Sequence, residues 1–167
     1  FIQVYGLTET CGAGTILEPE DHDPSLGKLR SCGKVAPTAE LKIVDSKGNS
    51  LGPNEVGEIT YRSKSVMKGY WNRPEATAEV IDQNGWFHSG DIGYLDNDGF
   101  LYLCDRLKDM IISGGENVYP AEVESILYAH EAIIEVAVIG QPDSQWGGCG
   151  CSGGASTRRK FAIRRIA

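Results

Sequence analysis

The chain has 167 residues, of which 41% are hydrophobic and 23% are charged, a composition typical of globular proteins. Residues 1–147 hold 11 Lys and Arg against 23 Asp and Glu, a balance of −12, whereas residues 148–167 hold five basic residues and no acidic one. An acidic body disfavours nucleic acid or an anionic membrane as the main partner, and no apolar run approaches the roughly 20 residues of a membrane-spanning helix.

The first hundred residues are predicted to be rich in β-strands. An apolar strand is expected at residues 1–4, and polar and apolar residues alternate at 40–43 and 58–62, with a turn at 45–49 between them. Such alternation is typical of strands with one buried and one exposed face. A hairpin is predicted where two apolar segments flank Asp96-Asn97-Asp98-Gly99.

Helices are predicted at two places. Residues 74–81 form a short helix, because Pro74 occupies its first turn and acidic residues lie near its start. Residues 120–130 form a second helix between predicted strands at 110–113 and 133–139. The residues that share one face of this helix are Val123, Ile126, Leu127 and His130.

The pattern changes from β-rich to mixed after residue 104, and we predict a domain boundary at about Asp105. The predicted fold class is α+β, with a β-rich domain at residues 1–104 and the beginning of a small α+β domain at 105–147. The chain starts with Phe1 and has no basic or apolar leader, so we expect an internal piece of a longer protein.

Residues 148–167 differ abruptly from the rest, since they are first rich in glycine and then basic. We interpret them as an aberrant tail, disordered or translated out of frame. Cys149 and Cys151 lack two further ligands nearby for a structural metal site, and the basic run lacks the interspersed aromatics of an RNA-binding arm. Cys11, Cys32 and Cys104 are expected to be reduced and buried.

The first candidate site is Tyr5-Gly6-Leu7-Thr8-Glu9, directly after the first strand. The Tyr5 ring can lie on a base, Gly6 permits close approach of the backbone, Thr8 can bond a phosphate, and Glu9 can hold Mg²⁺. An ordinary turn with solvated polar residues is the alternative, and for the pentapeptide alone it is the favoured interpretation.

The second candidate is the segment 85–93, Gly-Trp-Phe-His-Ser-Gly-Asp-Ile-Gly. Gly90 turns the backbone so that Asp91 projects, and a carboxylate suits the 2′,3′-diol of a ribose. A plain turn at the end of a strand is the alternative. His88 is interpreted as structural, because no partner for it is evident.

The third candidate is the segment 105–124, in which charged residues surround a short apolar strand and a Gly-Gly pair follows. The guanidinium of Arg106 suits oxygen-rich ligands, Lys108 and Asp109 suit a pivot, and Gly114-Gly115 leaves room for a thin ligand. A surface cluster of ion pairs is the alternative.

Taken together, these motifs resemble the adenylate-forming, or AMP-binding, superfamily, and most closely its fatty-acyl-CoA synthetase branch. The resemblance runs from Phe1 to about Gly147. It rests on the three candidate segments and on Gly-Tyr-Trp-Asn-Arg-Pro-Glu-Ala-Thr at residues 69–77. The resemblance implies that residues 1–104 are the distal part of the AMP-binding domain, followed by a hinge and the start of the C-terminal domain at 105–147.

The resemblance also implies residue roles. Tyr5 would stack on adenine beside Gly6, Thr8 would contact the α-phosphate, and Glu9 would ligate Mg²⁺. Asp91 would bind the ribose hydroxyls with help from Arg106. Lys108 would be the hinge residue, and Gly114 and Gly115 would line the channel for the pantetheine arm of coenzyme A.

The implied function is that of an ATP-dependent acid–thiol ligase, with a fatty acid as the expected carboxylic acid substrate and ATP, Mg²⁺ and coenzyme A as the expected cofactors. Aryl or medium-chain acids, or a non-catalytic nucleotide-binding remnant, are the alternatives. We expect a cytoplasmic protein, with peripheral membrane association left open. A phosphate loop is expected before Phe1 and a catalytic lysine after Gly147, so residues 1–167 alone are predicted to be inactive.

Overall fold

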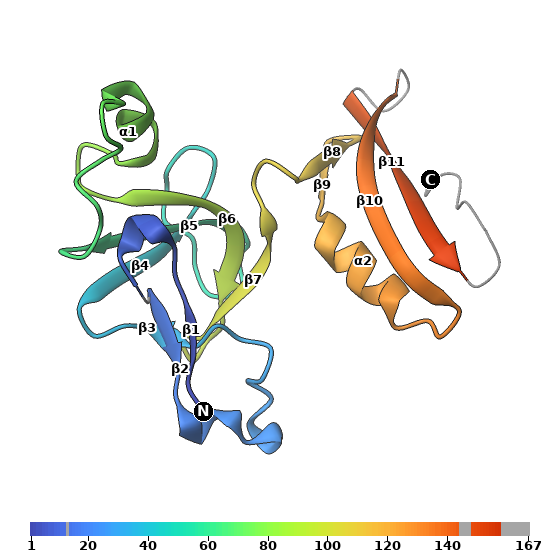
Figure 1. The fold of residues 1–167 in the computed structure, drawn as a ribbon, viewed down its shortest axis with the longest axis horizontal. Helices are drawn as coiled ribbons and strands as arrows, with labels where there is room; N and C mark the ends of the chain where they lie inside the picture. Colours follow the sequence, from blue (N-terminus) through green and yellow to red (C-terminus); the bar gives the residue numbers. More distant parts are fainter. Residues whose placement is uncertain (13, 144–147, 158–167) are drawn as a thin grey trace. The chain divides into compact units, whose positions relative to one another are not determined.

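The structure, a computed structural model, describes residues 1–12, 14–143 and 148–157, with side-chain surroundings up to residue 141. It divides into two compact units, one ending at Leu103 and the other beginning at Cys104 (Figure 1). This division lies next to the boundary predicted from the sequence.

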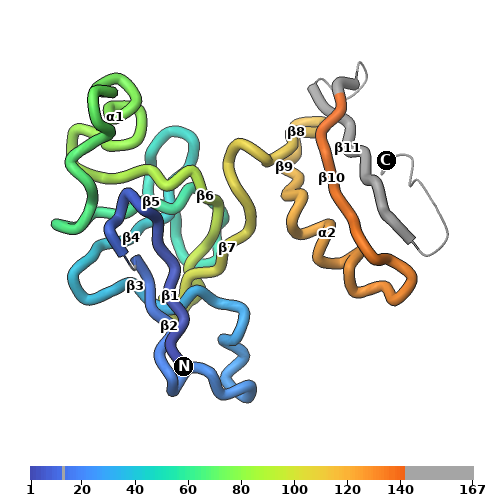
Figure 2. Tube along the Cα trace, in the orientation of Figure 1, coloured from blue at the N-terminus to red at the C-terminus, as the bar shows by residue number. Residues whose placement is uncertain are grey.

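The first unit contains two β-sheets. The larger sheet has the order β4 (Ala39–Val44), β5 (Gly57–Ser63), β6 (Phe87–Leu95) and β7 (Leu101–Arg106), with β4 and β6 both antiparallel to β5. The smaller sheet has the order β1 (Gln3–Tyr5), β2 (Thr15–Leu17) and β3 (Lys34–Val35). The trace in Figure 2 shows β1 and β2 running side by side, as their antiparallel pairing requires.

The core of this unit lies on one face of the larger sheet. Its fully buried members come from alternating positions of β4, β5 and β7, and they are Ile43, Ile59, Tyr61 and Leu101. The smaller sheet is joined to the larger because the amide of Cys32 donates to the carbonyl of Leu101 at 2.7 Å and that of Leu101 to Gly33 at 2.9 Å. Both sheets therefore position one another, and Tyr5 packs against the common core.

The predicted local elements of the first unit are present. The two alternating segments form the antiparallel pair β4 and β5, in which Leu41 faces Tyr61. The first predicted helix is α1 (Pro74–Val80). The Asp96–Gly99 segment joins β6 to β7, with the Asp96 side chain accepting bonds from the amides of Asp98 and Phe100.

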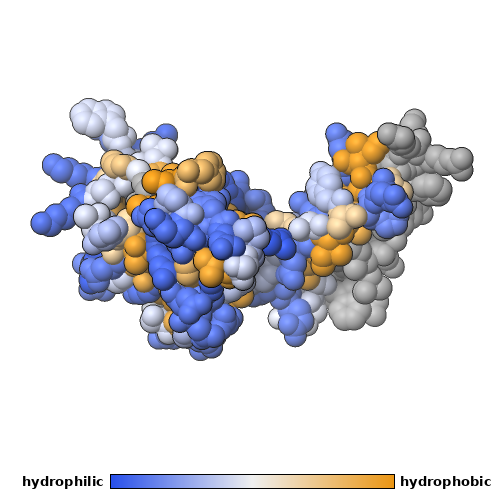
Figure 3. All heavy atoms as spheres, turned by 90° about the horizontal axis from the view of Figure 1, so that it is seen from below, coloured by the Kyte–Doolittle hydropathy of each residue, from blue (hydrophilic) through white to orange (hydrophobic). Residues whose placement is uncertain are grey.

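The second unit consists of two strand pairs and a helix. The hairpin of β8 (Ile111–Ser113) and β9 (Glu116–Val118) precedes α2 (Pro120–Tyr128), and β10 (Ile133–Asp143) pairs antiparallel with β11 (Gly148–Thr157). Ile111 and Val138 form its buried core, with Val118 and Val123 packed against them. Figure 3 shows other apolar side chains at the surface of this unit.

Three findings differ from the sequence-based expectations. Residues 148–157 form the strand β11, where disorder was one reading of the tail; the out-of-frame interpretation stays a prediction. Ile126, expected on the buried face of α2, is 69% exposed, so a narrower stripe of this helix faces the core. Cys11, which follows the 3₁₀ helix (Thr8–Thr10) in a left-handed conformation with φ of 52°, is exposed and not buried.

None of the helices in the described part of the chain is long and apolar enough to cross a membrane.

Candidate functional site

Two residues from separate sequence motifs meet in the first unit. The hydroxyl of Tyr5, at the end of β1, donates a hydrogen bond to Oδ2 of Asp91 in β6 at 2.5 Å. Asp91 is only 6% exposed, and the Tyr5 ring lies 6.3 Å from that of Tyr61. Burial, and then the bond to Asp91, raise the pKa of Tyr5 far above its usual range, so the hydroxyl stays protonated as a donor.

The orientation of the Asp91 side chain depends on an irregularity in the pairing of β5 and β6. Thr60 faces His88 and Glu58 faces Ile92, so three residues of β6, Ser89 to Asp91, stand opposite the single residue Ile59. Gly90 has a φ of +70°, a left-handed conformation that favours glycine. Such bulges bend a strand and redirect its side chains, and here the redirected side chain is a carboxylate.

Side chains hold this bulge in place. The Ser89 hydroxyl donates to the Ile59 carbonyl at 2.6 Å and accepts from the Asp91 amide at 3.1 Å. Glu58 contacts Nδ1 of His88 at 2.7 Å through one oxygen and accepts from the Gly90 amide at 3.1 Å through the other. The partner of His88, which the sequence did not reveal, is therefore Glu58.

Glu9 and Thr8 lie in the 3₁₀ helix that follows β1. Oε1 of Glu9 accepts a bond from the Tyr70 hydroxyl at 2.8 Å, and its carbonyl accepts from the Met67 amide at 2.7 Å. Thr8 is exposed. The 68–73 segment therefore orients Glu9 through Tyr70, a contact that local sequence patterns do not indicate.

Gly6 has a structural reason to be glycine. A Cβ atom at this position would stand 2.0 Å from the carbonyl oxygen of Gly12, so no larger residue fits without moving the loop. The amide of Gly14 closes the same loop by donating to the Tyr5 carbonyl at 2.7 Å. The backbone of Gly12 thus occupies the space that a side chain at position 6 would fill, which is reason enough for glycine there. The expected approach of a ligand to the Gly6 backbone stays a prediction.

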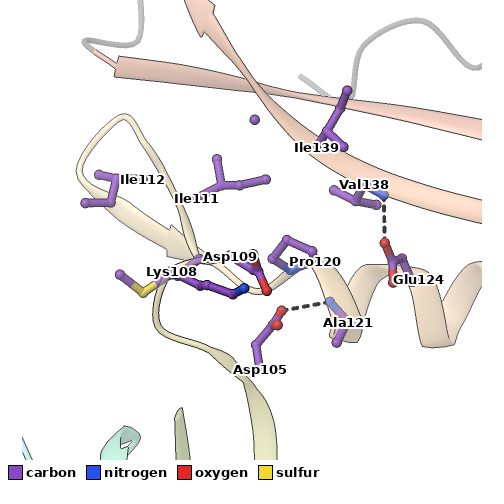
Figure 4. Close-up of a pocket in the computed structure, with 12 residues that line it drawn as sticks. Asp105, Lys108, Asp109, Ile111, Ile112, Pro120, Ala121, Glu124, Val138 and Ile139 are labelled. Atoms are coloured by element: carbon purple, nitrogen blue, oxygen red, sulfur yellow. Dashed lines mark hydrogen bonds between the residues drawn. The ribbon is translucent and has the colours of Figure 1, made fainter. Parts of the chain in front are cut away.

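The third candidate segment belongs to the second unit. After β7, the amides of Asp109 and Met110 both donate to the Arg106 carbonyl and close a turn that contains Lys108. Asp105 accepts from the Arg106 amide at 2.7 Å and, through its other oxygen, from the Ala121 amide at 2.9 Å (Figure 4). Asp105 thus caps the N-terminal end of α2, where a negative charge is favourable.

A pocket of about 770 Å³ opens beside this turn, and Figure 4 shows Lys108 and Asp109 at its edge. Apolar lining comes from Ile111 and Val138, while Glu124 accepts a bond from the Val138 amide at 2.8 Å. The lining of the pocket therefore combines apolar and charged side chains.

Gly114 and Gly115 form the two-residue loop between β8 and β9, with φ values of 61° and 89°. Positive φ at both central residues is the requirement of a type I′ hairpin turn. The pair therefore has a local role in this hairpin, and its contact with coenzyme A stays a prediction.

Comparison with known proteins identifies the family. The family model for AMP-binding enzymes matches residues 1–71, and that for the AMP-binding enzyme C-terminal domain matches residues 122–151. The chain belongs to the AMP-binding enzyme family. The first candidate segment lies inside the first match, and most of α2, β10 and the start of β11 lie inside the second.

Two curated relatives in this AMP-binding family act on different acids. The chain is 50% identical over 146 residues to the long-chain-fatty-acid–CoA ligase FadD13 of Mycobacterium tuberculosis, covering 87% of this chain and 28% of that protein. It is 53% identical over 145 residues to the 2-succinylbenzoate–CoA ligase of Geobacillus kaustophilus, covering 87% and 29%. The chain thus spans less than a third of these relatives.

A solved structure of an AMP-binding relative has the same fold. The o-succinylbenzoate CoA synthetase of Bacillus subtilis, in complex with its acyl-adenylate intermediate, is 45% identical, with a TM-score of 0.84 over 96% of this chain and 32% of that one. A second complex of the same enzyme contains ATP and magnesium ion, with a TM-score of 0.82. The α+β fold class is therefore confirmed.

The residues of this AMP-binding chain fit the nucleotide that the family implies. A carboxylate has about four acceptor positions, so Asp91 can bond ribose hydroxyls while it accepts from Tyr5. Among the described residues no group of three metal-binding side chains occurs. A single carboxylate such as Glu9 still suits Mg²⁺, which keeps several waters and binds phosphate oxygens for its remaining positions.

Proposed function

We propose that residues 5–9 and 85–93 form part of the nucleotide-binding site, and residues 105–124 the hinge region, of an ATP-dependent acid–CoA ligase. The single observation that carries the proposal is the bond between Tyr5 and Asp91, because it brings together an aromatic ring and a carboxylate at one buried place. An adenosine offers a flat base and a vicinal diol, which match these two groups. The names of the relatives support the same reaction class.

The proposed reaction has two steps. A carboxylate oxygen attacks the α-phosphorus of ATP, the bond to pyrophosphate breaks, and acyl-AMP forms. The thiol sulfur of coenzyme A then attacks the acyl carbon, loses its proton, and displaces AMP to give a thioester. Magnesium at Glu9 would supply positive charge where negative charge gathers in the first step.

The chain's own residues then divide the work. Tyr5 would hold the adenine, and Asp91 with Arg106 would hold the ribose, while Thr8 would donate to the α-phosphate. Lys108 would be the pivot for the domain rotation between the steps, a gating motion. In the second step, the Gly114–Gly115 turn would lie along the pantetheine arm.

We infer a fatty acid as the substrate from the resemblance of the 69–77 and 114–122 segments to fatty-acyl-CoA synthetases. An aryl acid is the second candidate, which the higher identity to a 2-succinylbenzoate ligase supports. The cytoplasm is the proposed location.

Pyrophosphate exchange and thioester formation by the full-length protein, measured with a panel of fatty and aryl acids, test this function. Asp91→Ala is expected to lower kcat/KM by at least about 100-fold, because it removes charge-assisted bonds to substrate hydroxyls. Asp98→Ala, an exposed residue of the β6–β7 turn, is the matched control. Turnover that Asp91→Ala leaves intact would refute the assignment, and residues 1–167 alone are expected to give no exchange.

A further inference from the structure

We propose that Glu58 is a positioning residue that fixes the 89–91 bulge, so that Asp91 presents its carboxylate to the ribose hydroxyls. The inference rests on the proposed nucleotide site. Neither Glu58 nor the strand that carries it belongs to the motifs from which that site was predicted.

The contacts of Glu58 span the bulge. Its two oxygens contact the ring of His88, which is the last residue before the bulge, and the amide of Gly90 at the bulge's centre. The neighbouring β5 and β6 are drawn side by side in Figure 1. A bidentate contact of this kind restricts both the position and the direction of the bulge, because two bonds fix more degrees of freedom than one.

The Gly90 amide explains why a hydrogen-bond acceptor is needed at position 58. A residue inside a bulge is left out of the regular strand ladder, and its amide requires another acceptor. The acceptor is Oε1 of Glu58, whose side chain is 18% exposed. In such a partly buried place a hydrogen bond to a charged group is stronger than at the surface.

Only one residue, Gly90, connects the contact of Glu58 with the position of Asp91. Gly90 precedes Asp91 directly, and its left-handed φ of +70° sets the direction in which the backbone continues. The Gly90 amide belongs to the peptide between Ser89 and Gly90, so loss of the Glu58 contact would allow that peptide to rotate and the φ of Gly90 to change. The Asp91 carboxylate would then sample several directions, and its selectivity for a diol would fall, whereas contacts with the base at Tyr5 would persist.

The test compares AMP with 2′,3′-dideoxy-AMP, which lacks both ribose hydroxyls, as ligands of residues 1–167. We expect the wild type to prefer AMP by about tenfold or more, the effect of one charge-assisted bond. Glu58→Ala should bring the preference below about threefold while its affinity for the dideoxy nucleotide stays unchanged. A merely structural role would weaken the binding of both ligands alike, and that result would overturn the proposal.

Two further variants of Glu58 and one control sharpen the comparison. Glu58→Gln keeps a carbonyl oxygen for the Gly90 amide and should retain most of the preference. Glu58→Asp keeps the charge but is too short to reach both partners, so it should lose the preference for AMP. It therefore provides the same test if Glu58→Ala does not fold. Glu40→Ala removes an exposed carboxylate that pairs with Arg62 on the same sheet, and it should change nothing.

A readout without nucleotide separates this inference from the proposed function. Amide hydrogen exchange at Gly90 should accelerate by about tenfold or more in Glu58→Asp or Glu58→Ala, while exchange at Thr60 stays the same. If the wild type shows no preference for AMP, the proposed ribose site is wrong. If Gly90 exchange is unchanged in the variants, Glu58 does not position the bulge.

Discussion

Replacement of Tyr5 by phenylalanine tests the bond at the centre of the site. The variant keeps the ring beside Tyr61 and removes only the hydroxyl that donates to the buried Asp91. Hydrogen bonds to charged groups contribute about 1.5–3 kcal/mol. We therefore expect Tyr5→Phe to lower the free energy of unfolding by about that amount at neutral pH.

The same variant has a defined pH dependence. The folded state raises the pKa of Tyr5 above the value of about 10 that an unfolded chain has, chiefly through burial. The contribution of the protonated hydroxyl is therefore complete below about pH 10 and is lost as the pH rises further. One proton corresponds to about 1.4 kcal/mol per pH unit well above the unfolded pKa, and the unfolded tyrosine is half ionised at about pH 10, so the difference between wild type and Tyr5→Phe should shrink by about 1 kcal/mol between about pH 10 and 11.

Urea titrations at several pH values, followed by circular dichroism and tryptophan fluorescence, measure this difference. Tyr128→Phe serves as the control, because Tyr128 is 51% exposed in α2 and the loss of its hydroxyl should leave stability at neutral pH unchanged. The reasoning is refuted if Tyr5→Phe is as stable as the wild type at neutral pH. A stability difference that stays constant from about pH 9 to about pH 11 refutes the pKa argument.

Three further changes follow from the packing. Asp105→Ala removes the cap of α2 at Ala121 and should destabilise the second unit by about 1 kcal/mol in urea titrations; an unchanged midpoint would contradict the cap. Gly33→Ala should cost at least about 3 kcal/mol because its Cβ would stand 2.0 Å from main-chain atoms, whereas Gly27→Ala, with a similar positive φ and open space, should cost about 1 kcal/mol; equal losses would argue against the close approach. Tyr61→Phe should keep or raise thermal stability by up to about 1 kcal/mol, because the buried hydroxyl has no hydrogen-bond partner among the described residues; a clear loss would indicate a bound water.

Local patterns in the sequence predicted the elements whose formation depends on near neighbours. The helix that begins at Pro74 and the Asp96–Gly99 turn carry their own signals, a proline in the first turn and a carboxylate that bonds two amides. The exposure of Ile126 could not be foreseen, because helical spacing defines a face but not how much of that face a partner covers.

The site was predictable only as separate motifs. Tyr5 and Asp91 were each expected to contact a nucleotide, but their bond joins residues 86 positions apart and depends on how the two sheets pack. Glu58 was missed for a similar reason: it accepts a bond from the Gly90 amide within the irregular pairing of β5 and β6, and alternation of residue types predicts strands without their bulges. Gly6 was interpreted from ligand needs, whereas the Gly12 carbonyl already requires it.

A titration of the ¹⁵N-labelled chain with AMP, monitored through backbone amide shifts, tests whether Tyr5 and Asp91 bind a nucleotide together. We expect the largest shifts at Tyr5–Glu9 and at Ser89–Asp91, the two segments that the Tyr5–Asp91 bond brings together. The absence of shifts in both segments at saturating AMP, or shifts confined to residues after Cys104, would contradict this expectation.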